Sequence, residues 1–291
     1  MTDLHFPADE ADSVIRVALD EDLGPDGVDV TTSATIPSDQ VTRAGVVARG
    51  PGVVAGIPAV GLVFDEVARR LGAPGLTITA HRCDGDEVAE GDVLVTLDGS
   101  AQVTLVGERT MLNLVSRLSG VATHTRQWAR VLEGTGALVL DTRKTTPGLR
   151  ALEKYAVRAG GGTNKRMGLY DVAMIKDNHK LAAGSLTAAY AAVRARYPQV
   201  LVQVEVTTTA EALEAVGVGA RFLLCDNMSV DTLGATVRAV RATGEQVELE
   251  ATGGLTLEQA RAYAETGVDY LSVGGLTHSS PILDVALDIV G

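Results

Sequence analysis

The sequence is poor in cysteine and in positive charge. Cys83 and Cys225 are its only cysteines, and neither has a CxxC companion. Neither a disulfide framework nor a zinc site is therefore indicated, and both thiols are expected in the core. Lys and Arg number 25 against 37 Asp and Glu, which gives a formal charge of -12. Such acidity argues against nucleic acid as a partner, because phosphate backbones select basic faces.

Membrane and export signals are missing as well. No window of the sequence approaches the roughly eighteen consecutive apolar residues that a membrane-spanning helix needs. The opening MTDLHFPADEADS is acidic where a signal peptide would be basic. The sequence therefore predicts a cytoplasmic protein without a membrane partner.

Several well-known catalytic signatures are also absent. The chain contains no GxSxG, HExxH or GxGxxG motif, and its five histidines show no metal-ligand spacing. No nucleophile, zinc-protease or dinucleotide signature is thus available to explain an activity.

What the chain does contain is enough apolar sequence for a substantial core. With 46% hydrophobic and 21% charged residues, its 291 residues correspond to one large domain or two ordinary ones. Residues 11–23 and 59–71 have the periodicity of helices, and short β-type runs occur between residues 41 and 97. These features predict a small α+β domain, followed by one long helix or a broken pair over residues 104–133.

Beyond this helix, apolar β-type runs alternate with helical patterns. The six runs cover residues 137–142, 172–177, 201–206, 221–227, 246–251 and 269–275. Such alternation is typical of a parallel sheet with both faces covered.

Five of these runs close on an ionisable residue, namely Asp141, Lys176, Glu205, Asp226 and Glu250. In an α/β barrel the C-terminal strand ends converge on one mouth, whereas an open doubly wound sheet would place them in a row. The missing dinucleotide fingerprint favours the barrel, and because only six strands are clear we expect it to be incomplete.

Positive charge is concentrated between residues 142 and 166, where seven cations stand with a single acid. Arg150, Lys154 and Arg158 repeat every four residues and are expected on the solvated face of a helix. Arg143 and Lys144 instead follow a strand directly, which would put them at the barrel mouth. Because Arg forms two hydrogen bonds to a carboxylate or phosphate and Lys adds a point charge, the pair predicts a polyanion pocket.

Two further features suit a phosphorylated sugar. Glu205 and Asp226 could hold ribose hydroxyls or a hydrated Mg²⁺, with a salt bridge to nearby lysines as the alternative. The pairs Gly253–Gly254 and Gly274–Gly275 close the last two runs, where barrels commonly bind phosphate through backbone N–H groups. Each pair could also form an ordinary turn. The residues alone predict a phosphate-handling barrel.

A longer set of motifs carries a more specific resemblance. DTRKTTPGLR at 141–150 occurs with KYA at 154–156, GGG at 160–162, Asn164, Arg166 and IKDNH at 175–179. In this combination the chain resembles the quinolinate phosphoribosyltransferase family, also called nicotinate-nucleotide pyrophosphorylase (carboxylating). The similarity extends from DVTT at 29–32, through ERT at 108–110 and Asn113, to Val273 and Gly274.

The resemblance implies an enzyme of NAD biosynthesis that transfers phosphoribosyl from phosphoribosyl pyrophosphate (PRPP) to quinolinate. Pyrophosphate and CO₂ leave, and nicotinate mononucleotide is formed. It also implies an α/β fold in which an N-terminal open sandwich over residues 1–115, joined by residues 280–291, precedes an incomplete barrel over residues 116–279. Members of the family work as homodimers or dimer-based hexamers, in which one subunit's N-terminal domain caps its neighbour's barrel.

The family's site residues can be carried over motif by motif. By this resemblance, Arg109 would enter the neighbouring site, and Arg143, Lys165 and Arg166 would hold the quinolinate carboxylates. Lys144 and Lys176 would face the pyrophosphate or the carboxylates, while Glu205 and Asp226 would face the ribose hydroxyls and Mg²⁺. Thr252, Gly253, Gly254, Gly274, Gly275 and His278 would surround the 5′-phosphate, and Thr142 completes the substrate-binding set. The implied catalytic residues are Lys144, Lys176, Glu205 and Asp226, with Mg²⁺ as cofactor.

Two positions depart from the family pattern. Many members have His where this chain has Lys165, and Ser is frequent where it has Thr252. Lysine keeps a cationic donor at the first position, but the change leaves open a paralogous transferase that acts on a related pyridine carboxylate. Two other classes also remain: a Schiff-base aldolase with Lys176 as nucleophile, and a phosphometabolite sensor that retains the fold.

Overall fold

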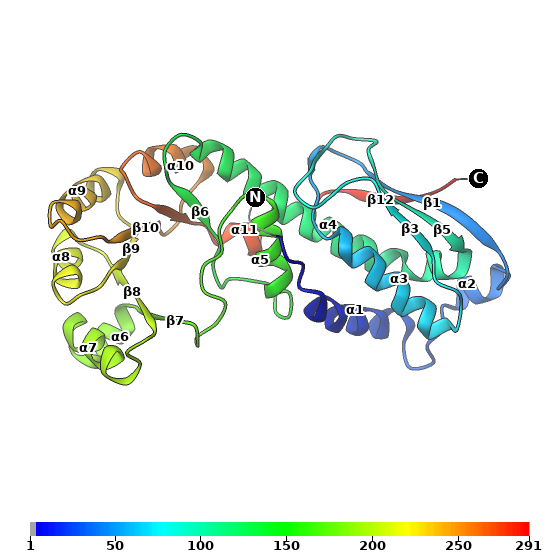
Figure 1. Cartoon of the computed structure of the whole chain (residues 1–291), viewed down its shortest axis with the longest axis horizontal. Coiled ribbons are helices and arrows are strands. Elements are labelled where there is room, and N and C mark those ends of the chain that lie inside the picture. The colour runs from blue at the N-terminus through cyan, green and yellow to red at the C-terminus, as the bar shows by residue number, and fades with distance from the viewer. Residues whose placement is uncertain (1–3, 291) are drawn as a thin grey trace. The chain divides into compact units, whose positions relative to one another are not determined.

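The computed structural model describes residues 4–290 (Figure 1). The chain folds into two compact units. Unit 1 contains the chain up to Arg126, together with Thr145–Gly161 and the residues from Leu276 onward; unit 2 contains Gln127–Lys144 and Gly162–Gly275. The domain limits expected from the sequence, 1–115 with 280–291 and 116–279, differ from these units chiefly in the placement of residues 145–161.

Unit 1 is built on an antiparallel sheet with the strand order β12-β1-β5-β3. The strands of the unit are β1 (Val41–Ala48), β2 (Gly52–Val53), β3 (Thr77–Ala80), β4 (Glu87–Val88), β5 (Val93–Ser100) and β12 (Val285–Val290), with β2 and β4 forming a separate pair. Ala48 of β1 lies opposite Val285, and Arg43 lies opposite Val290. The sheet is therefore completed by a strand that follows all of unit 2 in the chain.

The helices of unit 1 agree with the predicted apolar periodicity. They are α1 (Ala8–Leu23), α2 (Val30–Thr35), α3 (Ile57–Leu71), α4 (Ala101–Leu132), which extends into unit 2, and α5 (Arg150–Ala159). Ile15 and Leu19 of α1 are fully buried, and α1 packs beside α3 (Figure 1). The region predicted as one long helix or a broken pair is a single 32-residue helix, α4.

Local hydrogen bonding explains the DVTT motif at residues 29–32. The Asp29 carboxylate accepts hydrogen bonds from the backbone N–H groups of Thr31 and Thr32, at 2.9 and 3.0 Å, and so caps the first turn of α2. Hydrogen bonds from Thr32 hold the pKa of Asp29 below its usual value. This motif therefore has a structural role in this chain.

Two glycines allow backbone segments to approach α4 more closely than a side chain would permit. A Cβ atom on Gly120 would lie 2.1 Å from the carbonyl oxygen of Pro281, and one on Gly160 would lie 2.4 Å from the carbonyl oxygen of Ala122. Pro281 leads into β12, and Gly160 ends α5. Both segments thus pack directly on α4.

Two expectations about individual side chains are wrong. Lys154 was predicted on a solvated helix face but is only 1% exposed, because it lies in a helix in which every residue from 152 to 157 is buried. Tyr155 of this helix donates a hydrogen bond to Asp84 and packs edge-on against Phe6. Cys83 was predicted in the core but is exposed, whereas Cys225 is buried as expected.

Unit 2 contains all six predicted strands in one parallel sheet. They are β6 (Leu138–Leu140), β7 (Val172–Ile175), β8 (Leu201–Val206), β9 (Phe222–Asp226), β10 (Glu248–Thr252) and β11 (Tyr270–Ser272), in the order β6-β11-β10-β9-β8-β7. Since β6 and β7 stand at opposite edges of the sheet, the barrel is incomplete, as predicted.

The remaining helices follow the strands of unit 2. They are α6 (Asp177–Ala183), α7 (Leu186–Arg196), α8 (Thr209–Gly217), α9 (Val230–Arg241), α10 (Leu257–Ala264) and the short α11 (Gly275–His278), which leads into unit 1. Figure 1 shows α7 to α10 around the outside of the strands. Val204, Leu223 and Leu249 form a row of fully buried residues across neighbouring strands.

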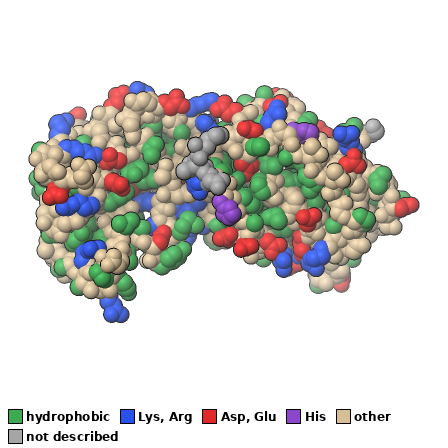
Figure 2. All heavy atoms as spheres, in the orientation of Figure 1, with side chains coloured by type: hydrophobic (Ala, Val, Ile, Leu, Met, Phe, Trp, Pro, Cys, Tyr) green, Lys and Arg blue, Asp and Glu red, His purple; other side chains and the backbone are tan. Residues whose placement is uncertain are grey.

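Charge and hydropathy of the surface add two simple findings. Among residues 4–290, no helix is long and apolar enough to cross a membrane. On the face shown in Figure 2, acidic and basic side chains are interspersed. The net charge of -12 is therefore not gathered into a single acidic patch on that face.

Candidate active site

The candidate site lies where the parallel strands of unit 2 end. Lys176 follows β7, Asp226 ends β9, and Asp141 follows β6. Glu205 of β8 and Glu250 of β10 both pair with Leu224 of the strand between them, so these two carboxylates are level across the sheet. Because side chains alternate along a strand, both point away from the buried row that begins with Val204.

Lys165 is held by a buried carboxylate. Its Nζ lies 2.5 Å from Oε1 of Glu250, and the side chains are 7% and 0% exposed. The backbone N–H of Lys165 and the amide of Asn164 donate to the buried carboxylate of Asp141, at 2.8 and 2.6 Å. Burial lowers the pKa of Lys165, an effect that Glu250 opposes. Glu250 is thus the partner of a residue that the resemblance assigned to substrate.

Arg143 and Arg166 form a cationic pair on the same unit. Arg166 donates from Nη1 to the carbonyl oxygen of Val172 at 2.9 Å. Burial, and next the charge of Arg143, lower the pKa of Arg166. The Nε atom of Arg143 is buried and has no hydrogen-bond partner among the described residues. Two neighbouring guanidiniums with an unused donor are suited to binding an anion.

The turn that carries Arg143 is fixed locally. The hydroxyl of Thr142 accepts a hydrogen bond from the backbone N–H of Lys144 at 3.0 Å. Lys144 itself is exposed, while Thr142 and Arg143 are partly buried. The turn therefore gives the two neighbouring cations different degrees of access to solvent.

Lys176 and Glu205 form an ion pair with an N–O separation of 3.6 Å, and their side chains are 51% and 13% exposed. The salt bridge that the sequence left as an alternative for Glu205 is therefore present. Asp226 is partly buried and accepts a hydrogen bond from the side-chain amide of the adjacent Asn227 at 2.7 Å. Its carboxylate makes no ion pair with the described residues.

One of the two glycine pairs has a steric requirement. Gly253 has a φ of +99°, and a Cβ atom there would lie 2.4 Å from Oδ1 of Asn227. The backbone N–H of Asn227, itself at a φ of +53°, donates to the carbonyl oxygen of Thr252 at 2.9 Å. Gly253 thus lets two strand-end loops approach closely. In the second pair, Gly275 begins α11.

The acidic residues do not form a closed metal site. No group of three or more His, Cys, Asp or Glu able to hold a metal occurs among residues 4–290. Glu205 and Asp226, on adjacent strands, offer two carboxylates. Mg²⁺ is often held by one or two carboxylates together with substrate phosphates and water. The donor set therefore fits an ion that arrives with a phosphorylated ligand.

Two of the predicted site residues, Arg109 and His278, belong to unit 1 rather than to unit 2. Arg109 is exposed on α4 in unit 1, and it makes no ion pair with the described residues. His278 is exposed at the end of α11. The sequence missed Glu250 as the partner of Lys165 and Asn227 as the partner of Asp226. The strand-end position of Glu250 was visible, but its partner was not.

Comparisons with known proteins cover nearly the whole chain. Residues 29–119 match the model "Quinolinate phosphoribosyl transferase, N-terminal domain", and residues 121–288 match the corresponding C-terminal domain. The chain is 46% identical to a nicotinate-nucleotide pyrophosphorylase (carboxylating) of Mycobacterium leprae, over 99% of this chain and 100% of that protein. It is 39% identical to a quinolinate phosphoribosyltransferase (decarboxylating) of Nicotiana glauca, over 97% and 83%. The solved nicotinate-nucleotide pyrophosphorylase of Francisella tularensis superposes with a TM-score of 0.91 at 31% identity, covering 98% of each chain.

Proposed function

The chain belongs to the quinolinate phosphoribosyltransferase family, and from this premise we propose how its own residues carry out the reaction. The enzyme transfers phosphoribosyl from PRPP to quinolinate with loss of CO₂, in the biosynthesis of NAD. Which side chains bind, orient and stabilise each substrate is our proposal.

The observation that carries the proposal is the Arg143–Arg166 pair. Two guanidiniums repel each other, and one has a buried donor without a partner. A dicarboxylate would neutralise both charges and take up the unused donor, as quinolinate can. We assign the two carboxylates of quinolinate to Arg143 and Arg166. We assign Lys165 to the edge of this pocket, because it feels the charge of Arg166 and is a cation already oriented by Glu250.

The other strand ends are assigned to PRPP. Lys144 and Lys176 supply charge for the pyrophosphate, and Glu205 and Asp226 bind the ribose hydroxyls. The loops at Gly253–Gly254 and Gly274–Gly275, with Thr252 and His278, surround the 5′-phosphate. The need for glycine at position 253 has a steric reason, because only a glycine there leaves room for Asn227.

Mg²⁺ would be held by Glu205 and Asp226 together with oxygens of PRPP. When bound, it neutralises charge on the departing pyrophosphate. The chain's own contribution is to hold the quinolinate dianion in line with C1 of the ribose. No general base is needed, because the pyridine nitrogen already has a free lone pair. Loss of CO₂ leaves an electron pair at C2, which the adjacent positive nitrogen stabilises until a proton is taken up.

Neither the Schiff-base aldolase nor a transferase for a related pyridine carboxylate gains support from an observation on this chain. A Schiff-base lysine is made nucleophilic by an apolar or cationic pocket, whereas Lys176 is half exposed and contacts a carboxylate. A related pyridine carboxylate would have to match the same two guanidiniums. The assay below includes nicotinate as such a substrate.

The decisive experiment follows pyrophosphate and CO₂ when the protein is mixed with PRPP, Mg²⁺ and quinolinate. Equal amounts of both products from quinolinate, and none from nicotinate, are expected. Arg143→Ala and Arg166→Ala should lose quinolinate binding in calorimetry while keeping the wild-type melting temperature. Arg221→Ala is the matched control, because it removes an equally charged side chain that precedes β9 at the other end of the sheet. Unchanged affinity in the first two variants would refute the pocket.

We also propose that two subunits share each site, with Arg109 entering its neighbour. The exposure of Arg109 on an isolated chain is consistent with this role. Arg109→Ala and Lys176→Ala should each be inactive alone, and mixing them should restore part of the activity through hybrid dimers. Subunit exchange without recovered activity would contradict a shared site. A cytoplasmic location stays a prediction.

A further inference from the structure

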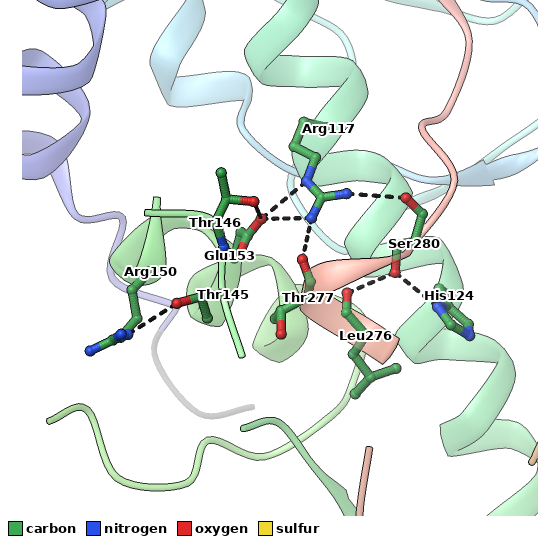
Figure 3. A network of polar contacts seen from close by, with 9 residues as sticks. All are labelled: Arg117, His124, Thr145, Thr146, Arg150, Glu153, Leu276, Thr277 and Ser280. Carbon is green, nitrogen blue, oxygen red and sulfur yellow. Dashed lines mark hydrogen bonds and ion pairs between the residues drawn. The ribbon is translucent and has the colours of Figure 1, made fainter. Parts of the chain in front are cut away.

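A partly buried polar network in unit 1 connects segments that are far apart in the sequence (Figure 3). At its centre, Arg117 of α4 donates from Nε and Nη2 to Oε1 of Glu153 in α5, at 3.1 and 2.6 Å. The Glu153 side chain is fully buried, and that of Arg117 is 21% exposed. Neither residue belongs to the binding set proposed above.

Glu153 holds the turn that follows Arg143–Lys144. Its Oε2 accepts from the backbone N–H of Thr146 at 3.0 Å, and its Oε1 accepts from the hydroxyl of Thr146 at 2.8 Å. Arg150 adds a hydrogen bond of 3.1 Å to the hydroxyl of Thr145. Thr145 and Thr146, which directly follow Arg143–Lys144, are thus both anchored by α5.

Arg117 also holds the segment that follows Gly274–Gly275. Its Nη2 donates to the carbonyl oxygen of Thr277, and its Nη1 donates to that of Ser280 at 3.1 Å. The Ser280 hydroxyl is 2.8 Å from Nδ1 of His124. The last carbonyls of a helix have no partner within it, and here the guanidinium supplies donors for this end of α11 (Figure 3).

We propose that Arg117 and Glu153 are positioning residues for the substrate site. One ion pair fixes the turn after Arg143–Lys144 and the helix end after Gly274–Gly275, the two places at which the chain passes from unit 2 into unit 1. The planar fork of arginine suits this task, because it can serve a carboxylate and two carbonyls at once, which the point charge of lysine cannot. The inference rests on the proposed function for the roles of the segments it positions.

The sharpest test uses a pair of variants that differ in one hydroxyl. Thr146→Val removes the hydrogen bond to Oε1 of Glu153, and Thr146→Ser keeps it. Because small displacements of binding groups reduce rates strongly, Thr146→Val should lower kcat/KM for quinolinate about tenfold, while Thr146→Ser retains wild-type kinetics. Hydrogen exchange over residues 142–149 should accelerate in Thr146→Val alone. Arg117→Met should raise KM for both quinolinate and PRPP, since it releases both segments.

Glu66 provides a matched control in the same unit. Its carboxylate is 5% exposed and pairs with Arg69 and Arg70, so Glu66→Gln removes a buried charge without touching the network. This variant should lower the melting temperature and leave KM and kcat unchanged. If Thr146→Val and Thr146→Ser have equal kinetics and equal exchange, the positioning role is refuted. Failure of the substrate assignment would show differently, as an unaltered quinolinate affinity in Arg143→Ala.

Discussion

The buried pair Lys165–Glu250 should show strong coupling in a double-mutant cycle. Lys165→Met leaves the Glu250 carboxylate buried without its cation, and Glu250→Leu leaves the ammonium without its anion. With side chains 7% and 0% exposed and 2.5 Å apart, each single change is expected to cost about 3–5 kcal/mol of unfolding free energy. Oε2 of Glu250 has no hydrogen-bond partner among the described residues, so the native pair is incompletely compensated. The double variant should therefore be close to wild type in stability.

The chain itself supplies the probe for this cycle. Its one tryptophan, Trp128, is buried in unit 2, the unit that contains the pair. Urea unfolding followed by tryptophan fluorescence would give the four free energies. Two losses of about 3–5 kcal/mol each that largely vanish in the double variant correspond to a coupling of about 6 kcal/mol or more. If the double variant loses the sum of the two single losses, the pair is not an interacting unit and the reasoning fails. Since Lys165 is also a proposed carboxylate ligand, the double variant should bind quinolinate more weakly despite its stability.

Three further outcomes are expected. Burial raises the pKa of the Cys225 thiol to about 12. A thiol reagent at pH 8 should therefore react with one thiol per native chain, that of Cys83, and with two after denaturation. Two reactive thiols in the native protein would contradict the burial of Cys225. Gly120→Ala should overpack the contact with Pro281 and lower the free energy of unfolding, and with it the urea midpoint, by about 2–3 kcal/mol. Gly61→Ala, where the helix has open space, should raise the free energy of unfolding by about 0.5–1 kcal/mol. A change of the same sign in both variants would be evidence against the contact geometry. The hydrogen bond from a neighbouring guanidinium holds the pKa of Glu66 at about 2, below its ordinary 4.5, so its stabilisation is complete above pH 4.5 and is lost as pH falls toward 2. With one partner 66% exposed and screened, the difference from Glu66→Gln should be about 1–2 kcal/mol at pH 7, and a difference that has not decreased at pH 2.5 would refute it.

The sequence predicted the strands well because their signal is local. Six apolar runs appear as β6 to β11, and the absence of a further clear run correctly indicated an incomplete barrel. The long helix over residues 104–133 was also visible from its own periodicity, although only the structure shows it to be unbroken. The motifs shared with the family then indicated which reaction the chain catalyses.

Partners that are distant in the chain were not predictable in the same way. Lys165 and Glu250 are 85 positions apart, and Arg117 and Glu153 are 36 apart. Each looks like an ordinary charged residue until the fold places its partner. The burial of Lys154 was missed for the same reason, because an i,i+4 series of cations predicts a solvated face unless other segments cover the helix.

The pairing of β1 with β12 has a consequence for how the protein is made. During synthesis the ribosome would release β1 long before β12, and in the interval β1 has an edge of unpaired N–H and C=O groups. Unit 2 lies entirely within that interval, so the barrel can fold while the first sheet is still open. Such a nascent chain is a natural client for chaperones. In a truncated chain that ends before Val285, this edge of β1 would stay unpaired and open to association with other chains.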